Sequence, residues 1–136
     1  MPTFLHVGCG RKNKTKTTKA FSTPEWQEIR LDIDPQSKPD VVASMLDMSS
    51  IASQSVDAIF TSHNLEHLYA HEIPVALLEF KRVLSPHGFL VVTCPDLQEI
   101  CRLVGEGHLI DPLYSSPAGP ISALDVLYGH QKSLVN

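Results

Sequence analysis

Short apolar runs rich in β-branched residues recur along the chain and alternate with segments of helical periodicity. The runs are largely continuous rather than strictly alternating, as expected for parallel strands that are buried on both faces. Five runs are strand candidates: residues 4–7, 29–33, 41–43, 56–61 and 89–93. Strands that alternate with helices form βαβ units. The pattern therefore predicts an α/β fold with a doubly wound, Rossmann-like and mostly parallel sheet of five strands.

Three segments have the spacing of helices. Residues 72–84 form the clearest one, which places four apolar side chains on one stripe: Ile73, Leu77, Phe80 and Leu84. A second helix is predicted to begin after Asp96, a capping residue, and to stop at Gly105. A short third helix is predicted over residues 122–128. The segment 106–136 is rich in Pro and Gly with no clear strand pair, so we expect an irregular C-terminal extension of one domain covering residues 1–136.

Composition and charge narrow the class of protein. The chain of 136 residues is 43% hydrophobic and 19% charged, as in ordinary globular proteins, and its net charge of −4 argues against a nucleic-acid or membrane-surface partner. No apolar run is long enough to span a bilayer, and no secretory signal is visible. Three cysteines without a C-x-x-C pair are typical of reduced thiols, which predicts a cytoplasmic protein.

The first predicted strand ends in Gly8-Cys9-Gly10, a turn that brings backbone close to a ligand in nucleotide-binding folds. The third glycine of G-x-G-x-x-G is absent, because Asn13 occupies its place. Asp32 ends the second strand 24 residues after Gly8, near the spacing at which an acid accepts hydrogen bonds from a ribose. Asp34 precedes a proline, and we interpret it as a turn residue.

Two further polar segments follow strands, at the edge where doubly wound sheets bind ligands. In "SMLDMSS", Asp47 could accept from an adenine amine and Met48 could cover the ring, although a helix cap explains the same residues. In "SVDAIFTSHNLEHL", a strand ends in the polar cluster His63–His67.

In this order and spacing, "LHVGCG", "LDID", "LDM", "SVDAIFTSHNLEHL" and "LLEFKRVLSPHGFLVVTCPD" resemble a class I S-adenosylmethionine-dependent methyltransferase of the small bacterial type 11 group. The resemblance covers residues 3–97 and implies S-adenosylmethionine as the cofactor. By this resemblance, the glycine turn lines the methionine of the cofactor, and Asp32 holds the ribose. Asp47 and Met48 flank the adenine, and Ser62 and His63 close the methionine end. The implied cofactor-binding residues are Gly8, Cys9, Gly10, Asp32, Ile33, Asp47, Met48, Ser62 and His63. S-adenosylmethionine has no pyrophosphate, so the third glycine is less needed for this cofactor. The alternative cofactor for the same glycine turn is NAD.

For the reaction, in-line transfer of a methyl group to a small-molecule or glycan acceptor is expected. His67, with Glu66 beside it, is the candidate general base. The alternative is that both residues only begin a helix and that no base exists.

The chain departs from the family in two places. The basic segment 11–19 replaces an amphipathic helix, and it is interpreted as a solvated mobile loop or as a lid that attracts an anionic acceptor. The last two strands of the family fold are missing, which leaves an open sheet edge. We therefore expect a homodimer that uses this edge or the segment 109–130, or else an inactive partner subunit or truncated enzyme.

A rival motif is "HNLEH" at 63–67, which fits the H-x-x-E-H signature of zinc hydrolases. The signature needs a helix and a third ligand well downstream, whereas here it follows a strand and no third ligand is signalled by spacing. We therefore expect no metal ligands.

Overall fold

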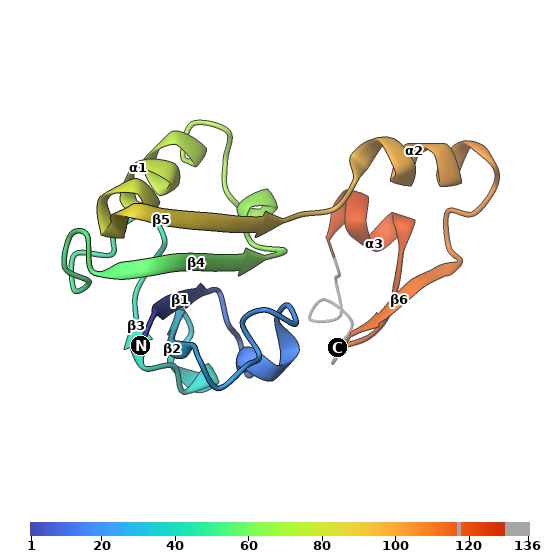
Figure 1. The fold of residues 1–136 in the computed structure, drawn as a ribbon. Coiled ribbons are helices and arrows are strands. Elements are labelled where there is room, and N and C mark those ends of the chain that lie inside the picture. The colour runs from blue at the N-terminus through green and yellow to red at the C-terminus, as the bar shows by residue number, and fades with distance from the viewer. Residues whose placement is uncertain (117, 130–136) are drawn as a thin grey trace. The chain divides into compact units, whose positions relative to one another are not determined.

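The computed structural model describes residues 1–116 and 118–129, and the chain divides into two compact units, Met1–Cys94 and Pro95–Asn136. The first unit contains the parallel sheet, and the second contains two helices and a hairpin (Figure 1). The expected single domain over residues 1–136 stays a prediction. In the part of the chain that is described, none of the helices has both the length and the apolar character needed to cross a membrane.

The sheet has five parallel strands in the order β3-β2-β1-β4-β5, which confirms the predicted α/β fold. The strands are β1 (Thr3–Val7), β2 (Gln27–Asp32), β3 (Val41–Val42), β4 (Val56–Ser62) and β5 (Leu84–Thr93). Strand β5 begins five residues earlier than predicted, because Leu84 pairs with Val56 before a bulge and pairing resumes at Phe89. Among the described strands, β5 and β3 form the two edges of the sheet.

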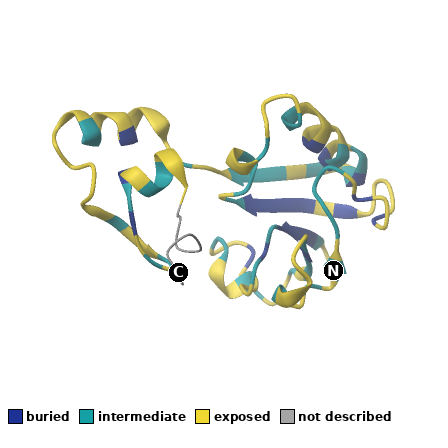
Figure 2. Cartoon of the chain, turned by 180° about the vertical axis from the view of Figure 1, so that it is seen from behind, coloured by how far each residue is buried: buried dark blue, intermediate teal, exposed yellow. Residues whose placement is uncertain are grey.

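Helix α1 (Ile73–Val83) covers one face of this sheet, and Figure 2 shows buried positions on the helix and on the strands. Leu5 and Val7 of β1 pack there in a buried cluster with Phe80 and Val83. The predicted helix is confirmed, but its predicted stripe is rotated. Leu77 is 42% exposed, whereas Ala76 is fully buried. Successive helical residues turn by about 100°, so the packing of Phe80 and Val83 points Ala76 inward and Leu77 outward.

The opposite face of the sheet is covered by residues 11–26, which we call the strap. In place of a helix, the strap inserts Phe21 beside Phe4 and Phe60 in a buried aromatic cluster, and the rings of Phe4 and Phe21 stack with centroids 4.4 Å apart. The ammonium of Lys14 donates to the carbonyl oxygens of Thr23 and Trp26 at 3.0 and 2.7 Å. The strap is therefore anchored to itself and to the sheet, whereas the sequence favoured a mobile loop.

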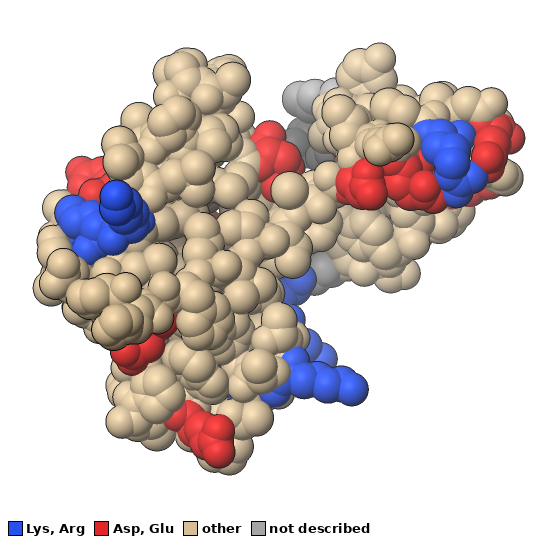
Figure 3. Space-filling model, turned by 45° about the horizontal axis from the view of Figure 1, so that its top comes forward, with Lys and Arg blue, Asp and Glu red and all other residues tan. Residues whose placement is uncertain are grey.

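The second unit contains α2 (Leu97–Gly105), β6 (Pro112–Ser116), β7 (Gly119–Ser122) and α3 (Ala123–Tyr128). Strands β6 and β7 form an antiparallel hairpin, so the expectation of an irregular segment without a strand pair is wrong. Arg102 of α2 is paired with Glu99 and Glu106, and adjoining blue and red side chains are visible on this unit in Figure 3. The predicted helices over 97–105 and 122–128 are confirmed.

Candidate functional site

The glycine turn after β1 has the backbone conformation for which glycine is needed. Gly8 and Gly10 have φ angles of +66° and +54°, in the left-handed region that side chains with a Cβ rarely adopt. The amide of Gly8 donates to the carbonyl oxygen of Leu31 at 2.8 Å, which ties the turn to the end of β2. The turn thus ends at the carboxyl edge of the sheet, between β1 and β2.

Asp32, the last residue of β2, fixes this turn from the neighbouring strand. Its Oδ2 accepts from the amide of Gly10 at 2.7 Å, and its Oδ1 accepts from the amide of Asp34 at 2.9 Å. The side chain of Asp34 instead accepts from the amide of Gln36 and caps the 3-10 turn Pro35–Ser37, as expected of a turn residue. The two carboxylates therefore have different surroundings, and only Asp32 contacts the glycine turn.

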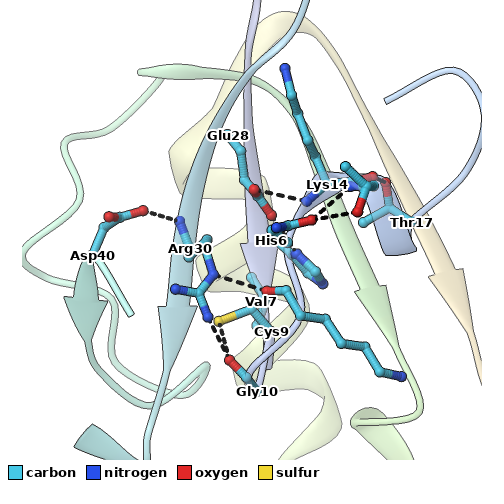
Figure 4. Close-up of polar contacts among 12 residues, drawn as sticks. His6, Val7, Cys9, Gly10, Lys14, Thr17, Glu28, Arg30 and Asp40 are labelled. Atoms are coloured by element: carbon cyan, nitrogen blue, oxygen red, sulfur yellow. Dashed lines mark hydrogen bonds and ion pairs between the residues drawn. The ribbon is translucent and has the colours of Figure 1, made fainter. Parts of the chain in front are cut away.

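A polar network lies behind the turn, on the strap side of the sheet (Figure 4). The Nδ1 of His6 lies 2.7 Å from Oε1 of Glu28, and Oε2 of Glu28 accepts from the amide of Lys14 at 2.8 Å. Burial lowers the pKa of His6 from its usual value of 6.5, although Glu28 opposes this shift. The contact of His6 with Glu28, and that of Glu28 with Lys14, therefore join β1 and β2 to the strap.

Asn64, which the sequence did not single out, completes the site from the end of β4. Its Nδ2 lies within 3.1 Å of the carbonyl oxygens of Val7 and Ser62 and of the Thr61 hydroxyl, so the amide is held between two strand ends. A Cβ on Gly8 would lie only 2.3 Å from Cγ and Oδ1 of Asn64. Gly8 is thus required both by its φ angle and by the space that Asn64 fills, a pairing between positions 56 residues apart that no local pattern signals.

A cavity of about 270 Å³ opens at this edge of the sheet. Its lining comes from the carboxyl ends of four strands, β1 to β4, and the loops that follow: Val7 and Gly8, residues 31–33, residues 43–45, and Asn64, His67 and Leu68. Four residues expected at the site on sequence grounds, namely Gly8, Asp32, Ile33 and His67, are therefore brought together in one lining. The volume is near the lower end of the range for small-molecule sites, and the lining has the usual mixture of apolar and a few polar groups.

The remaining expected residues lie outside the lining of this cavity. Cys9 is buried beneath the turn, and burial raises the pKa of its thiol. Met48, expected to cover an adenine, is fully buried in the core, whereas Met45 lines the cavity. Asp47 is exposed and accepts from the amide of Ser49. Cys9 and Met48 are therefore kept from the cavity by burial in the protein, and Asp47 by its contact within a turn.

The polar residues at the end of β4 and in the loop after it have different contacts. The Ser62 hydroxyl accepts from that of Thr93 at 2.6 Å, which joins the ends of β4 and β5. Glu66, expected beside His67, is 3.6 Å from Nδ1 of His63. Of the predicted catalytic pair, His67 lines the cavity, whereas Glu66 lies beside His63.

The zinc alternative finds no support in the structure. Over residues 1–116 and 118–129, no group of three or more His, Cys, Asp or Glu side chains is arranged to hold a metal ion. Residues 65–67 of the H-x-x-E-H motif form a single 3-10 turn rather than an α-helix, so the two histidines do not have the i, i+4 spacing on one helical face that the motif requires.

Comparison with known proteins gives one family and a group of solved structures. The profile of a family described as "Methyltransferase domain" matches residues 5–92, which include β2, β3, β4, α1 and most of β1 and β5. A search of curated proteins gives no match.

Two of the similar structures come from archaea. A SAM-dependent methyltransferase from Archaeoglobus fulgidus aligns with 93% of this chain at 21% identity and a TM-score of 0.61. A protein from Pyrococcus horikoshii aligns with 77% of it at 18% identity and a TM-score of 0.59. Identities this low establish the fold alone. This chain spans 59% and 51% of the length of these two structures, respectively.

Proposed function

The chain belongs to the methyltransferase domain family, and on that basis we propose that it binds S-adenosylmethionine and transfers the methyl group of this cofactor to an acceptor. The cofactor occupies the cavity at the carboxyl ends of β1, β2, β3 and β4. Its ribose lies against Asp32, its adenine between Ile33 and Met45, and its methionine end beside Gly8 and Asn64, which both line the cavity. Asp47, Ser62 and His63 remain candidates for contacts at the rim.

The main support for this proposal is the hydrogen bonding of the Asp32 carboxylate. A carboxylate has about four lone-pair sites. The amides of Gly10 and Asp34 occupy two of them and fix the direction of the group. About two sites remain for the two hydroxyls of a ribose, on a residue that lines the cavity. The acid is thus oriented before the cofactor binds, which reduces the entropy lost on binding.

In the proposed reaction, a nucleophile of the acceptor attacks the methyl carbon in line with the carbon–sulfur bond. That bond breaks, its electron pair stays on sulfur, and S-adenosylhomocysteine is released. Holding the reactants in line supplies much of the rate enhancement. If the acceptor is a hydroxyl or an amine, a base must also remove a proton, and His67 is the candidate because it lines the cavity. A small-molecule or glycan acceptor remains our proposal.

Thermal melting with S-adenosylhomocysteine tests the cofactor, and NAD and zinc serve as comparison ligands. At 100 times its dissociation constant, a ligand stabilises a protein by about 2.7 kcal/mol. The variant Asp32→Asn should weaken binding by about 10- to 100-fold, since hydrogen bonds to a charged group contribute about 1.5–3 kcal/mol. The matched control Asp34→Asn changes a neighbouring carboxylate that is outside the cavity lining, and it should bind normally. Equal losses in both variants, or no binding by the folded wild type, would contradict the proposal.

Turnover separates an active enzyme from a partner subunit that binds the cofactor without reacting. Release of S-adenosylhomocysteine is measured over a panel of hydroxyl, amine and carboxylate acceptors. With a hydroxyl or amine acceptor, His67→Gln should lower kcat by about 10²–10⁴-fold while cofactor binding is retained. Binding without turnover on any acceptor would favour the inactive subunit.

We also propose a homodimer, because β5 is an exposed edge strand among the described residues and unpaired edges favour association. Light scattering at micromolar concentration tests this proposal, and a monomer would contradict it.

A further inference from the structure

A second hollow lies on the first unit, apart from the cofactor cavity. Its volume is about 370 Å³, and it is lined by Arg11, Arg30, Gln36, Ser37 and Lys38. It shares no lining residue with the first cavity. The strap contributes Arg11, β2 contributes Arg30, and the turn after β2 contributes the other three. Three of its five lining residues are cationic, and none is acidic.

Arg30 supplies a fixed positive charge to this hollow. Its guanidinium donates to the carbonyl oxygen of Gly10 at 2.7 Å (Figure 4). It also donates to the carbonyl oxygens of Lys12 at 2.9 Å, Lys38 at 2.8 Å and Ser37 at 3.3 Å. These bonds use four of the five N–H donors of an arginine. The guanidinium is therefore held rigidly between the glycine turn and the turn after β2, with one donor to spare.

The charge of Arg30 lacks a carboxylate partner. The other two arginines with fixed partners, Arg82 and Arg102, are each paired with glutamate. No ion pair is formed by Arg11, Arg30 or Lys38 within residues 1–116 and 118–129. Carbonyl dipoles satisfy the donors of Arg30 but leave its net charge unchanged, so an anion is the missing counterpart.

Two carboxylates lie beside the hollow, because Asp40 and Asp34 accept from the backbone amides of Arg30 and Gln36 at 2.8 and 2.9 Å. The strap adds positive charge on the other side. The strap contains no acidic residue between positions 11 and 24, although the whole chain has a net charge of −4. Lys12 and Lys16 on the strap are exposed. A concave site lined by charges of one sign concentrates the field and attracts small ions of the opposite sign.

We propose that this hollow binds a phosphate group. Phosphate carries a charge of about −1.5 to −2 at neutral pH and several strong acceptor oxygens, and arginine with lysine is a common combination for holding it. Arg11, Lys38 and the remaining donor of Arg30 balance the charge. The hydroxyl of Ser37 and the side-chain carboxamide of Gln36 are further donor groups of residues that line the hollow. This proposal does not depend on the methyltransferase reaction.

Titration with inorganic phosphate at constant ionic strength tests the site, and acetate serves as a monoanion for comparison. Constant ionic strength is needed because general screening also changes stability. Phosphate should raise Tm in a saturable manner, and isothermal calorimetry should detect one site per chain. Acetate should produce a much smaller rise. Equal and unsaturable effects of the two anions would overturn the proposal.

A pair of charge-matched double variants locates the binding. Arg11→Gln with Lys38→Asn removes two cations from the hollow, and asparagine is chosen because residue 38 has a positive φ of 49° that asparagine tolerates. This variant should bind phosphate at least about tenfold more weakly. The control, Lys19→Gln with Lys81→Gln, removes two exposed cations elsewhere and should bind as the wild type does. The same loss in both double variants would show attraction by net charge alone and would refute the site.

Discussion

The contact between Gly8 and Asn64 predicts that two glycines of one turn respond differently to the same substitution. Alanine at either Gly8 or Gly10 is strained by a positive φ angle, at a cost of about 1–2 kcal/mol. A Cβ on Gly10 would have no atom within 4 Å. A Cβ on Gly8 would lie 2.3 Å from the amide of Asn64, a distance that real Cβ contacts do not reach.

The additional cost at Gly8 follows from what Asn64 must give up. Overpacking costs about 1–3 kcal/mol, and moving the amide weakens hydrogen bonds to Val7 and Ser62 that are worth about 0.5–1.5 kcal/mol each. Gly8→Ala should therefore destabilise the protein by about 2 kcal/mol more than Gly10→Ala does. For a unit of this size the difference corresponds to about 8–16 °C in Tm.

A double-mutant cycle measured by urea unfolding identifies the cause. Asn64→Ala removes the three atoms that would clash, so Gly8→Ala in that background should cost only about as much as Gly10→Ala in the wild type. The coupling free energy should be about 1–3 kcal/mol in favour of the double variant. Equal costs at the two glycines, or strictly additive effects of Gly8→Ala and Asn64→Ala, would refute the proposed contact.

Three further predictions concern the side chains of His6, of Met45 and Met48, and of Lys14. Burial lowers the pKa of His6 below 6.5 in the folded protein, so just below that pH the unfolded chain binds more protons than the folded one. The free energy of unfolding should therefore be highest above pH 6.5 and decrease as the pH falls below it. His6→Gln should remove this part of the pH dependence in urea unfolding at pH 5–8. Met48→Ala should cost about 2–5 kcal/mol of stability, whereas Met45→Ala should mainly weaken S-adenosylhomocysteine binding. Lys14→Met should cost about 1–3 kcal/mol in chemical denaturation because two carbonyl oxygens lose their donor, and Lys16→Met, at an exposed position, should cost less than about 0.5 kcal/mol.

The sequence predicted the sheet of this protein because local signals agree with the fold there. Strands buried on both faces need apolar residues in nearly every position, and these runs are visible without any knowledge of partners. The glycine turn and Asp32 were also predictable, because the turn follows β1 directly, Asp32 ends β2, and strand ends meet at one edge of a parallel sheet. The hairpin of β6 and β7 was missed, because its short strands have little apolar character and contain two prolines, Pro112 and Pro120.

Other features depend on contacts between distant parts of the chain. The sequence places Met45 and Met48 in one short segment, but only packing against the sheet decides that Met48 enters the core and Met45 lines the cavity. The anchoring of the basic strap likewise requires carbonyl groups that local pattern cannot supply.

Sequence by itself therefore determined the α/β fold, the family resemblance and the strand ends at which a ligand can bind. Tertiary structure alone decided that Asn64 fills the space above Gly8 and that Arg30 lies among four carbonyl oxygens without a carboxylate. The physical reason is that strand formation follows from the hydrophobicity of neighbouring residues. The fit of a side chain and the balance of a charge depend instead on groups that come together only when the chain folds.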